Sequence, residues 1–441
     1  MSTVTLHAFN WKYTDITNSL DSIRQAGYGA ILIPPPLYSD PRGDQWWQRY
    51  QPKDYRVLLS HLGGKQDLAK LIAACHRGSP RINVYADLVI NHMANEARDD
   101  RFDFPGKEEL KRYRQEPALY EENRLYGDLS TGLFSSQDFN HAGEIEGGEW
   151  SDRGAVQYQN LSGLPDLKDS DWVLQQQHLM VEALLNMGFD GFRIDAIKHI
   201  TERMIDNIAD RPETRNKFWF GEVLTGSDHD ERIFLEPFLR ETWMSAYDFP
   251  LFNTIREAFS FGGSLRSLVR PQDYGNALPW NRSVTFVVNH DVPHNHGFRS
   301  WLLDRQDEHL AHAYMLGRDG GVPLIYSDHN ESHYGEDRDR WLDIYKRPDV
   351  TAMIQFHNAV QGEGMVTLYE SDTLLIFRRG SRGIVAINKG DSNQWAEFNT
   401  WGLKNPGTFK DLIHGYELQL SGNRFTLFVP PRTAQMWLAK G

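Results

Sequence analysis

The chain has 441 residues, which is long for one domain and suits a large barrel with one or two smaller modules. Its 60 acidic and 47 basic side chains give a formal charge of −13, which argues against a nucleic-acid partner and favours neutral or cationic ligands. The single cysteine, Cys75, excludes an intrachain disulfide, and no apolar run is long enough to span a membrane.

The N-terminal part alternates between strand and helix patterns. A strand pattern over 4–11 precedes a helix pattern whose apolar face ends at Gly27. The run AILI (30–33) before three prolines predicts a second strand, apolar residues at helical spacing over 68–75 predict a second helix, and RINVYADLVINH (81–92) predicts a third strand. This order of elements predicts a parallel sheet.

The alternation stops over 93–163, where Gly, Asp, Glu, Ser and Asn are frequent. We predict a small inserted module there, because so long a structureless loop is rare in a compact domain. The alternation resumes with a helix pattern and then with strand patterns at 188–197, 217–224, 245–250, 283–290 and 322–328. Together with the first three, these make eight candidate strands, the number that closes a (β/α)8 TIM barrel.

A different pattern begins after residue 361. TLLIF (373–377) and GIVAIN (383–388) flank a short polar turn, and further strand patterns continue to Trp437, which predicts a β-sandwich. The predicted class is α/β: a TIM barrel with a small domain inserted after its third strand and a C-terminal all-β sandwich domain. The predicted borders are 1–92 and 164–361 for the barrel, 93–163 for the inserted domain and 362–441 for the sandwich.

Polar side chains gather at the ends of four predicted strands, where the active groups of such barrels lie. Because side chains alternate along a strand, Arg193 and Asp195 are expected to face the barrel mouth together. In chain order, the polar residues at these strand ends are Asp87, Asn91, His92, Arg193, Asp195, Lys198, His199, Glu222, Asn289, His290 and Asp291.

Three acids on three strand ends, Asp195, Glu222 and Asp291, suit the hydrolysis of glycosides. In a retaining enzyme one carboxylate attacks the anomeric carbon and a carboxylic acid roughly 5–5.5 Å away protonates the leaving oxygen. The positive charge of Arg193 predicts a lowered pKa for Asp195, as a nucleophile needs. The apolar residues around Glu222 predict a raised pKa, as an acid needs.

Several motifs, taken in chain order, resemble the α-amylase family of glycoside hydrolases: DLVINH (87–92), LPDL (164–167), GFRIDAIKH (191–199), GEV (221–223) and FVVNHD (286–291). The segment WWQRYQP (46–52) also looks like the substrate-stacking segment of animal and marine-bacterial amylases. The resemblance implies a retaining α-amylase. Such an enzyme cuts internal α-1,4-glucosidic bonds of starch, glycogen and maltooligosaccharides through a covalent glycosyl-enzyme intermediate.

The resemblance also implies a role for each matching residue. Asp195 would be the nucleophile, Glu222 the acid/base, and Asp291 the acid that holds and distorts the sugar. His92 and His290 would bind sugar hydroxyls, Arg193 would orient Asp195, and Lys198 would face an acceptor subsite. The donor side would be lined by Trp46, Trp47, Tyr50 and Gln51.

The same resemblance bears on two ions, calcium and chloride. A calcium ion between barrel and inserted module would be held by the side chains of Asn91 and Asp166 and by backbone carbonyls at Gln157 and His199, an all-oxygen shell that suits the metal. Chloride is not expected, although some relatives bind it near the acid/base. The position of their second basic ligand falls at Leu324, which cannot hold an anion.

Less specific readings compete with these roles. The acids could form structural ion pairs, the histidines and the Trp46–Trp47 pair could be core residues, Asp166 could cap a helix, and Lys198 could be a solvated helix residue. At the level of function, a transglycosylase or an exo-acting glucosidase would keep the same three acids. A non-catalytic carbohydrate-binding barrel would be expected to have lost at least one of them.

The expected partner is an α-glucan, with no nucleic acid or membrane, and the protein is expected to be a monomer. Residues 1–3 lead directly into a strand pattern, so no signal peptide is predicted. A cytoplasmic protein and a secreted one whose signal has been removed both fit this sequence, and the second is slightly preferred.

Overall fold

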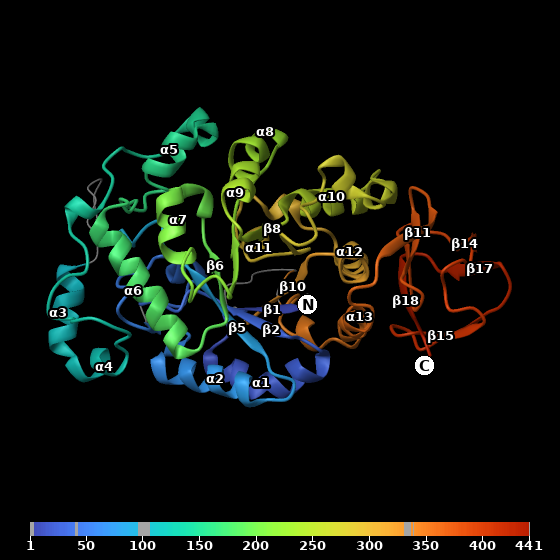
Figure 1. Cartoon of the computed structure of the whole chain (residues 1–441), viewed down its shortest axis with the longest axis horizontal. Coiled ribbons are helices and arrows are strands. Elements are labelled where there is room, and N and C mark those ends of the chain that lie inside the picture. The colour runs from blue at the N-terminus through green and yellow to red at the C-terminus, as the bar shows by residue number, and fades with distance from the viewer. Residues whose placement is uncertain (1–3, 40–42, 96–105, 330–336, 338, 441) are drawn as a thin grey trace.

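Eight parallel strands close into a barrel in this computed structural model, which describes residues 4–39, 43–95, 106–329, 337 and 339–440. The strands follow one another around the ring in chain order, and the last pairs with the first. The predicted barrel is therefore confirmed (Figure 1). Its strands are β1 (Thr5–Phe9), β2 (Ala30–Ile33), β5 (Asn83–Leu88), β6 (Gly191–Ile194), β7 (Phe218–Gly221), β8 (Ser245–Tyr247), β9 (Ser283–Thr285) and β10 (Val322–Asp328).

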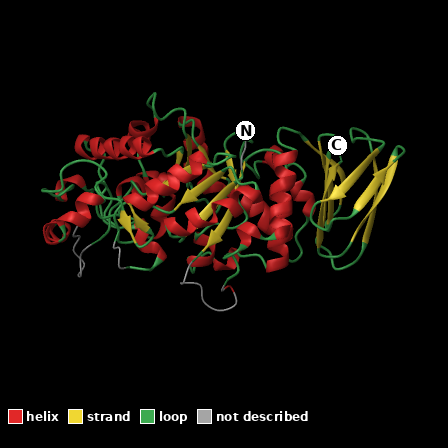
Figure 2. Cartoon of the chain, turned by 90° about the horizontal axis from the view of Figure 1, so that it is seen from below, coloured by secondary structure: helices red, strands yellow, loops and turns green. Residues whose placement is uncertain are grey.

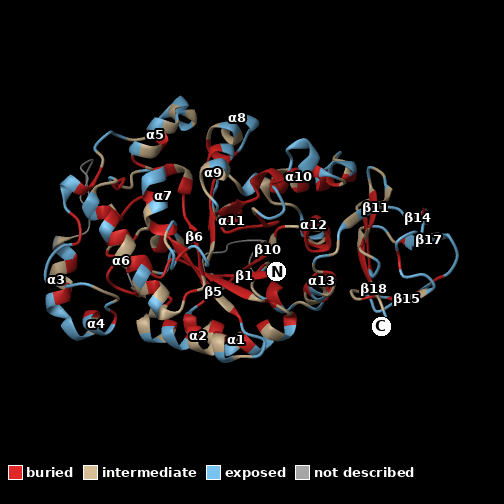
Figure 3. Cartoon of the chain, viewed as in Figure 1, coloured by how far each residue is buried: buried red, intermediate tan, exposed pale blue. Residues whose placement is uncertain are grey.

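Helices surround the barrel and bury apolar side chains against it (Figure 3). In the first of them Ile16, Leu20 and Ile23 point inward, and each such buried side chain stabilises the fold by about 1.5–3 kcal/mol. That helix ends at Gly27, whose φ of 97° lies in the left-handed region that glycine enters at little cost. The main helices are α1 (Tyr13–Ala26), α2 (Lys65–Arg77), α6 (Asp171–Met187), α7 (Glu202–Ala209), α9 (Glu236–Glu241), α10 (Phe249–Phe259), α12 (Arg305–Gly317) and α13 (Pro348–Ala359).

The segment between β5 and α6 forms a module at one end of the molecule (Figure 1). It contains α3 (Lys107–Gln115), α4 (Pro117–Glu122) and α5 (Arg153–Tyr158), with a small apolar cluster that includes Tyr113 and Tyr120. Its two ends meet in an antiparallel bridge, where the Leu167 amide donates to the Asn91 carbonyl at 2.8 Å and the Met93 amide to the Pro165 carbonyl at 3.2 Å. The module therefore leaves and re-enters the barrel at nearly one point.

The C-terminal part is all β and has its own apolar core, as Figure 2 shows at the opposite end of the molecule. A six-stranded sheet and the β14–β17 pair contribute to that core, and the predicted hairpin is present as β12 and β13. These strands are β11 (Met365–Glu370), β12 (Leu374–Arg379), β13 (Gly383–Asn388), β14 (Gln394–Asn399), β15 (Gly407–Asp411), β16 (Glu417–Leu420), β17 (Arg424–Val429) and β18 (Thr433–Ala439).

Among the described residues, none of the helices combines the length and the apolar composition that crossing a bilayer requires. The predicted domain borders near residues 92, 163 and 361 stay predictions, although the segments that they separate differ in architecture as expected.

Candidate active site

The guanidinium of Arg193 lies at the mouth of the barrel, and the carboxyl groups of the predicted acids lie around it. Its Nη1 lies 2.7 Å from each carboxylate oxygen of Asp87 and 2.8 Å from Oδ1 of Asp195. Its Nη2 lies 2.7 Å from Oε2 of Glu222. The Arg193 side chain has no exposed surface, so these charged contacts act in an environment with little water. The structure thus brings the fourth- and fifth-strand residues together as predicted.

The barrel register positions these groups. The Asp195 amide donates to the Leu88 carbonyl at 2.9 Å, and the Glu222 amide donates to the Ile194 carbonyl at 3.0 Å, so the strand ends stay aligned. Directly after β6, Ala196 adopts a φ of 47°, a left-handed conformation that is costly for a residue with a Cβ. Its amide donates to Oε2 of Glu222 at 3.1 Å.

Asp291 reaches the cluster from α11 (Asp291–His294), a short helix that follows β9. The Asp291 and Glu222 side chains lie near each other, and each shifts the pKa of the other. Because two buried carboxylates repel each other, the pair favours a state in which one of its members is protonated.

The pKa shifts run against the sequence prediction. Burial raises the pKa of Asp195 to about 8, and this outweighs Arg193, which acts to lower it. Burial also acts to raise the pKa of Glu222, but Arg193, the neighbouring Asp291 and the hydrogen bond from Ala196 bring it below its usual value. The predicted directions for Asp195 and Glu222 are both wrong, because one guanidinium is shared by several buried carboxylates and Glu222 holds one of its nitrogens.

The pKa of Asp291 lies well above its usual value, through burial and then through the charge of Glu222. Four carboxylates around one guanidinium, those of Asp87, Asp195, Glu222 and Asp291, cannot all be ionised at neutral pH. The cluster therefore carries at least one proton that can serve general acid catalysis.

The two predicted sugar-binding histidines are neutral. Burial lowers the pKa of His92 to about 4 and that of His290 well below its usual value. Nε2 of His92 lies 2.9 Å from the Tyr50 carbonyl oxygen. His92 is therefore in part a core histidine, because one ring nitrogen already has a partner within the protein. The His290 ring stacks on Tyr50 at 5.0 Å, and its Nδ1 has no hydrogen-bond partner among the described residues. A neutral imidazole of this kind can bind a hydroxyl.

The predicted donor-side segment forms a 3-10 helix over Trp46–Tyr50. Trp46 is half-buried and packs beside Tyr50 and His290, whereas Trp47 is 43% exposed, so only part of the pair is core. The Tyr50 hydroxyl donates to Asp87 at 2.9 Å and therefore joins this segment to the cluster. Gln51 ends the helix and is half-buried.

Lys198 is not a solvated helix residue. Its ammonium donates to the Leu224 carbonyl at 3.1 Å and lies 5.5 Å from the ring centroid of Phe234, in a π-helical turn over Glu231–Leu235. Burial lowers its pKa. The lysine is therefore held beside the chain that follows Glu222.

The residues predicted to hold calcium also meet. One terminal atom of the Asn91 amide lies 3.1 Å from Oδ1 of Asp166 and 2.9 Å from the His199 carbonyl oxygen. As a nitrogen this atom would donate to both; as an oxygen it would complete a group of three oxygens. Gln157 lies on α5, and its side-chain amide donates to the Ile200 carbonyl at 3.1 Å, next to His199.

Asp166 does not cap the following helix, because α6 begins at Asp171 and the Ser170 hydroxyl accepts from the Val173 amide instead. Burial raises the Asp166 pKa to about 8, which reflects a carboxylate surrounded by neutral groups. No group of three His, Cys, Asp or Glu side chains suited to a metal occurs within the described ranges, so a cation here would depend on amide and carbonyl oxygens.

Sequence reasoning assigned no role to Asp87 or Asp328. Asp87 is fully buried and shares Arg193 with the predicted acids, and its place in DLVINH at a strand end was the available signal. Asp328 ends the apolar run VPLIYSD, and an acid at the end of a buried strand was a comparable signal.

The comparisons with known proteins agree with this geometry. The family model for the α-amylase catalytic domain matches residues 12–225, and that for the α-amylase C-terminal all-β domain matches 369–440. A protein of Aeromonas hydrophila named alpha-amylase is 47% identical over 427 residues, which cover 93% of this chain and 89% of the relative. One of the same name from Thermomonospora curvata is 28% identical, with coverage of 98% and 72%.

Solved structures extend the likeness to the fold. Wild-type α-amylase I from Eisenia fetida superposes with a TM-score of 0.76 at 21% identity, covering 99% of this chain and 94% of that one. At such low identity the superposition concerns the fold alone. The sequence match to the Aeromonas relative goes beyond the fold and shows that the chain belongs to the α-amylase family.

Proposed function

We propose that this protein is a retaining α-amylase that hydrolyses internal α-1,4-glucosidic bonds of starch, glycogen and maltooligosaccharides. The observation that carries the proposal is the arrangement of Asp195, Glu222 and Asp291 around a buried Arg193 in a member of this family. The 47% identity to a relative named alpha-amylase supports the same substrate class.

The first half-reaction breaks the glycosidic bond. The reactive state is the one in which Asp195 is a carboxylate beside Arg193 and the proton of the coupled cluster lies on Glu222. In that state Asp195 attacks the anomeric carbon, the bond to the leaving oxygen breaks, and Glu222 gives its proton to that oxygen. Arg193 holds Asp195 in place through the 2.8 Å contact. Glu222 draws this proton from the buried carboxyl cluster, in which the pKa of Asp291 lies well above its usual value. Asp291, once ionised, accepts from sugar hydroxyls.

The second half-reaction releases the product. Glu222, now a carboxylate, takes a proton from water as the water oxygen attacks the anomeric carbon, and Asp195 leaves as a carboxylate. Two inversions give net retention. The cluster returns to its starting protonation, so no other acid or base is consumed.

We also propose a calcium ion at the junction of barrel and inserted module. The side-chain oxygens of Asn91 and Asp166 and the His199 carbonyl suit it, and the backbone carbonyl of Gln157 would be the fourth protein ligand. Two observations support this site. The Asp166 carboxylate is buried among neutral groups, and the oxygens named above converge beside it. The ion would supply positive charge that holds the module against the barrel.

The test is to incubate the protein with soluble starch and follow products by size and by anomeric form. We expect a rapid loss of long chains with the α-anomer released first. Release of the β-anomer first would contradict the retaining mechanism. Products that shorten only from chain ends, or grow longer than the substrate, would favour the exo-acting or transglycosylase alternatives.

A further inference from the structure

A chain of hydrogen bonds begins at the donor-side segment and passes through the end of β1. The Arg49 guanidinium is buried and donates to the carbonyl oxygens of Gly43 at 3.2 Å and Asp44 at 3.1 Å, which fixes the turn before the 3-10 helix. The same guanidinium donates to Oδ1 of Asn10 at 3.0 Å. Asn10 has a φ of 57°, so the end of β1 bends to make this contact.

The chain continues to the buried carboxylate of Asp328 at the end of β10. Asn10 donates from Nδ2 to Oδ1 of Asp328 at 3.1 Å, and the Tyr326 hydroxyl donates to Oδ2 at 2.6 Å. Nε2 of His294 lies 2.9 Å from the same Oδ2. Because a carboxylate only accepts, Nε2 of His294 carries the proton. Three donors to one buried carboxylate define its position and theirs.

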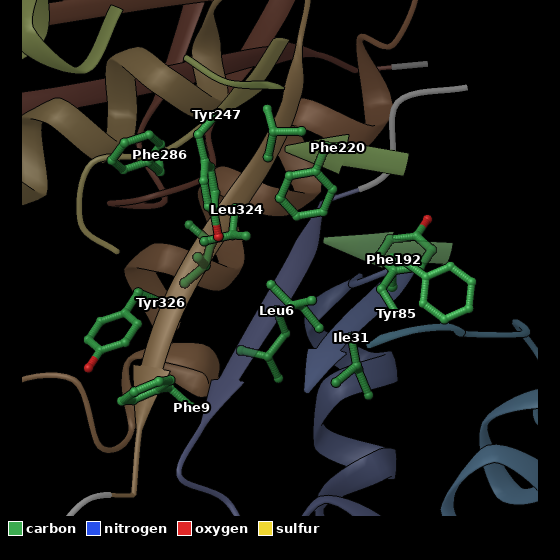
Figure 4. Packing of buried hydrophobic residues seen from close by; sticks show 14 of the residues in the cluster. Leu6, Phe9, Ile31, Tyr85, Phe192, Phe220, Tyr247, Phe286, Leu324 and Tyr326 are labelled. Atoms are coloured by element: carbon green, nitrogen blue, oxygen red, sulfur yellow. The ribbon is translucent and has the colours of Figure 1, made fainter. Parts of the chain in front are cut away.

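The contacts then lead back to the 3-10 helix from which they started. The His294 ring stacks on Trp46, with ring centroids 5.1 Å apart and planes 29° apart. Trp46 lies in the same 3-10 helix as Arg49, where the chain of hydrogen bonds began. Figure 4 shows Phe9 and Tyr326 close to one another, and Phe9 also packs on His294 with ring centroids 5.5 Å apart.

We propose that Asp328 is a positioning residue for the donor side of the cleft: through His294 it fixes the orientation of the Trp46 indole against the substrate. The inference rests on the proposed function, because it takes Trp46 to line the donor side of an α-glucan cleft, as the sequence predicts. Stacking of an indole on a sugar ring depends on its orientation, and a displacement of about 1 Å can cost about a hundredfold in rate. Asp328 touches neither substrate nor the reacting atoms in this scheme.

The experiment is a double-mutant cycle on a long maltooligosaccharide with Asp328→Asn, Trp46→Ala and the double variant. The amide of Asn places an N–H where the carboxylate accepts, so at least one donor loses its partner. We expect Asp328→Asn to raise KM about fivefold to tenfold while kcat changes less than about twofold. In the Trp46→Ala background the same change should raise KM less than about twofold, because the indole that it positions is gone.

A matched control separates positioning from general stability. Asp248 is another fully buried carboxylate at a strand end, and it accepts from the Leu251 and Leu278 amides and from the Ser283 hydroxyl. Asp248→Asn should lower the melting temperature, leave KM unchanged and combine additively with Trp46→Ala. His294→Phe keeps a ring against Trp46 but cannot donate to Asp328, and we expect it to raise KM as Asp328→Asn does.

The outcomes are distinct. Equal effects of Asp328→Asn in both backgrounds, or a lowered melting temperature with unchanged KM, would overturn the inference while the parent still hydrolyses starch. If Asp328→Asn does not fold, the cycle is measured with His294→Phe, and additivity there is equally decisive. A parent without activity on starch would overturn the proposed function, and the inference with it.

Discussion

Two groups of buried carboxylates differ in how their charge is balanced. At the barrel mouth Asp87, Asp195 and Glu222 surround the guanidinium of Arg193. At the junction with the inserted module, Asp166 meets the amides of Asn140 at 2.8 Å and of Asn91, which carry no charge. The first group has its counter-charge built in and can exchange protons among its members. For the second we propose a cation taken up from solution, and we expect that group to govern stability rather than chemistry.

The largest effect should come from the first group. Asp195→Asn is expected to lower kcat on starch by about a thousandfold or more, roughly 4 kcal/mol of transition-state stabilisation, because an amide cannot form the glycosyl intermediate. The melting temperature should change little, since Arg193 keeps Asp87 and Glu222 as partners. Activity within about tenfold of the parent, measured by reducing ends, would remove Asp195 from the role of nucleophile.

A smaller effect, on stability, should come from the second group. Calcium at about a hundred times its dissociation constant is expected to raise the free energy of unfolding by roughly 2.7 kcal/mol. Thermal unfolding with EDTA and with added calcium measures it. Asp166→Asn should remove the response.

The matched control is Asp411→Asn, a buried carboxylate of the C-terminal domain that accepts from the Met436 amide. That variant should lose stability and yet keep the full response to calcium. A calcium response that survives in Asp166→Asn would place the ion elsewhere. If EDTA has no effect on the parent, metal analysis decides between an absent ion and one bound too tightly to remove.

The smallest effect concerns chloride. Leu324 lies fully buried in the barrel interior, on the same face of β10 as Tyr326 (Figure 4). An anion near Arg193 would have to compete with the carboxylates already on that guanidinium, without a second basic group at Leu324. We expect activity to differ by less than about twofold between chloride and sulfate at equal ionic strength. A severalfold rise specific to chloride would contradict this.

The sequence was sufficient for the barrel because its strands are short apolar runs bounded by polar motifs, and for the meeting of the acids because strand ends share one face. It overestimated β9: Phe286, Val287 and Val288 are buried, yet the strand ends at Thr285. An apolar run records burial and does not distinguish a paired strand from a packed turn. The pKa directions failed because they depend on which atoms share Arg193, and chain order does not contain that information.

The inserted module leaves and re-enters the barrel at nearly one point, and this has a consequence for evolution. Because the segment enters and leaves through the His92–Asp166 bridge, its length can change without shifting the register of β5 against β6. Loop-closure entropy grows only as the logarithm of length, so each doubling costs about 0.6 kcal/mol. We therefore expect insertions and deletions in the module to be tolerated while the strand ends that carry the acids keep their alignment.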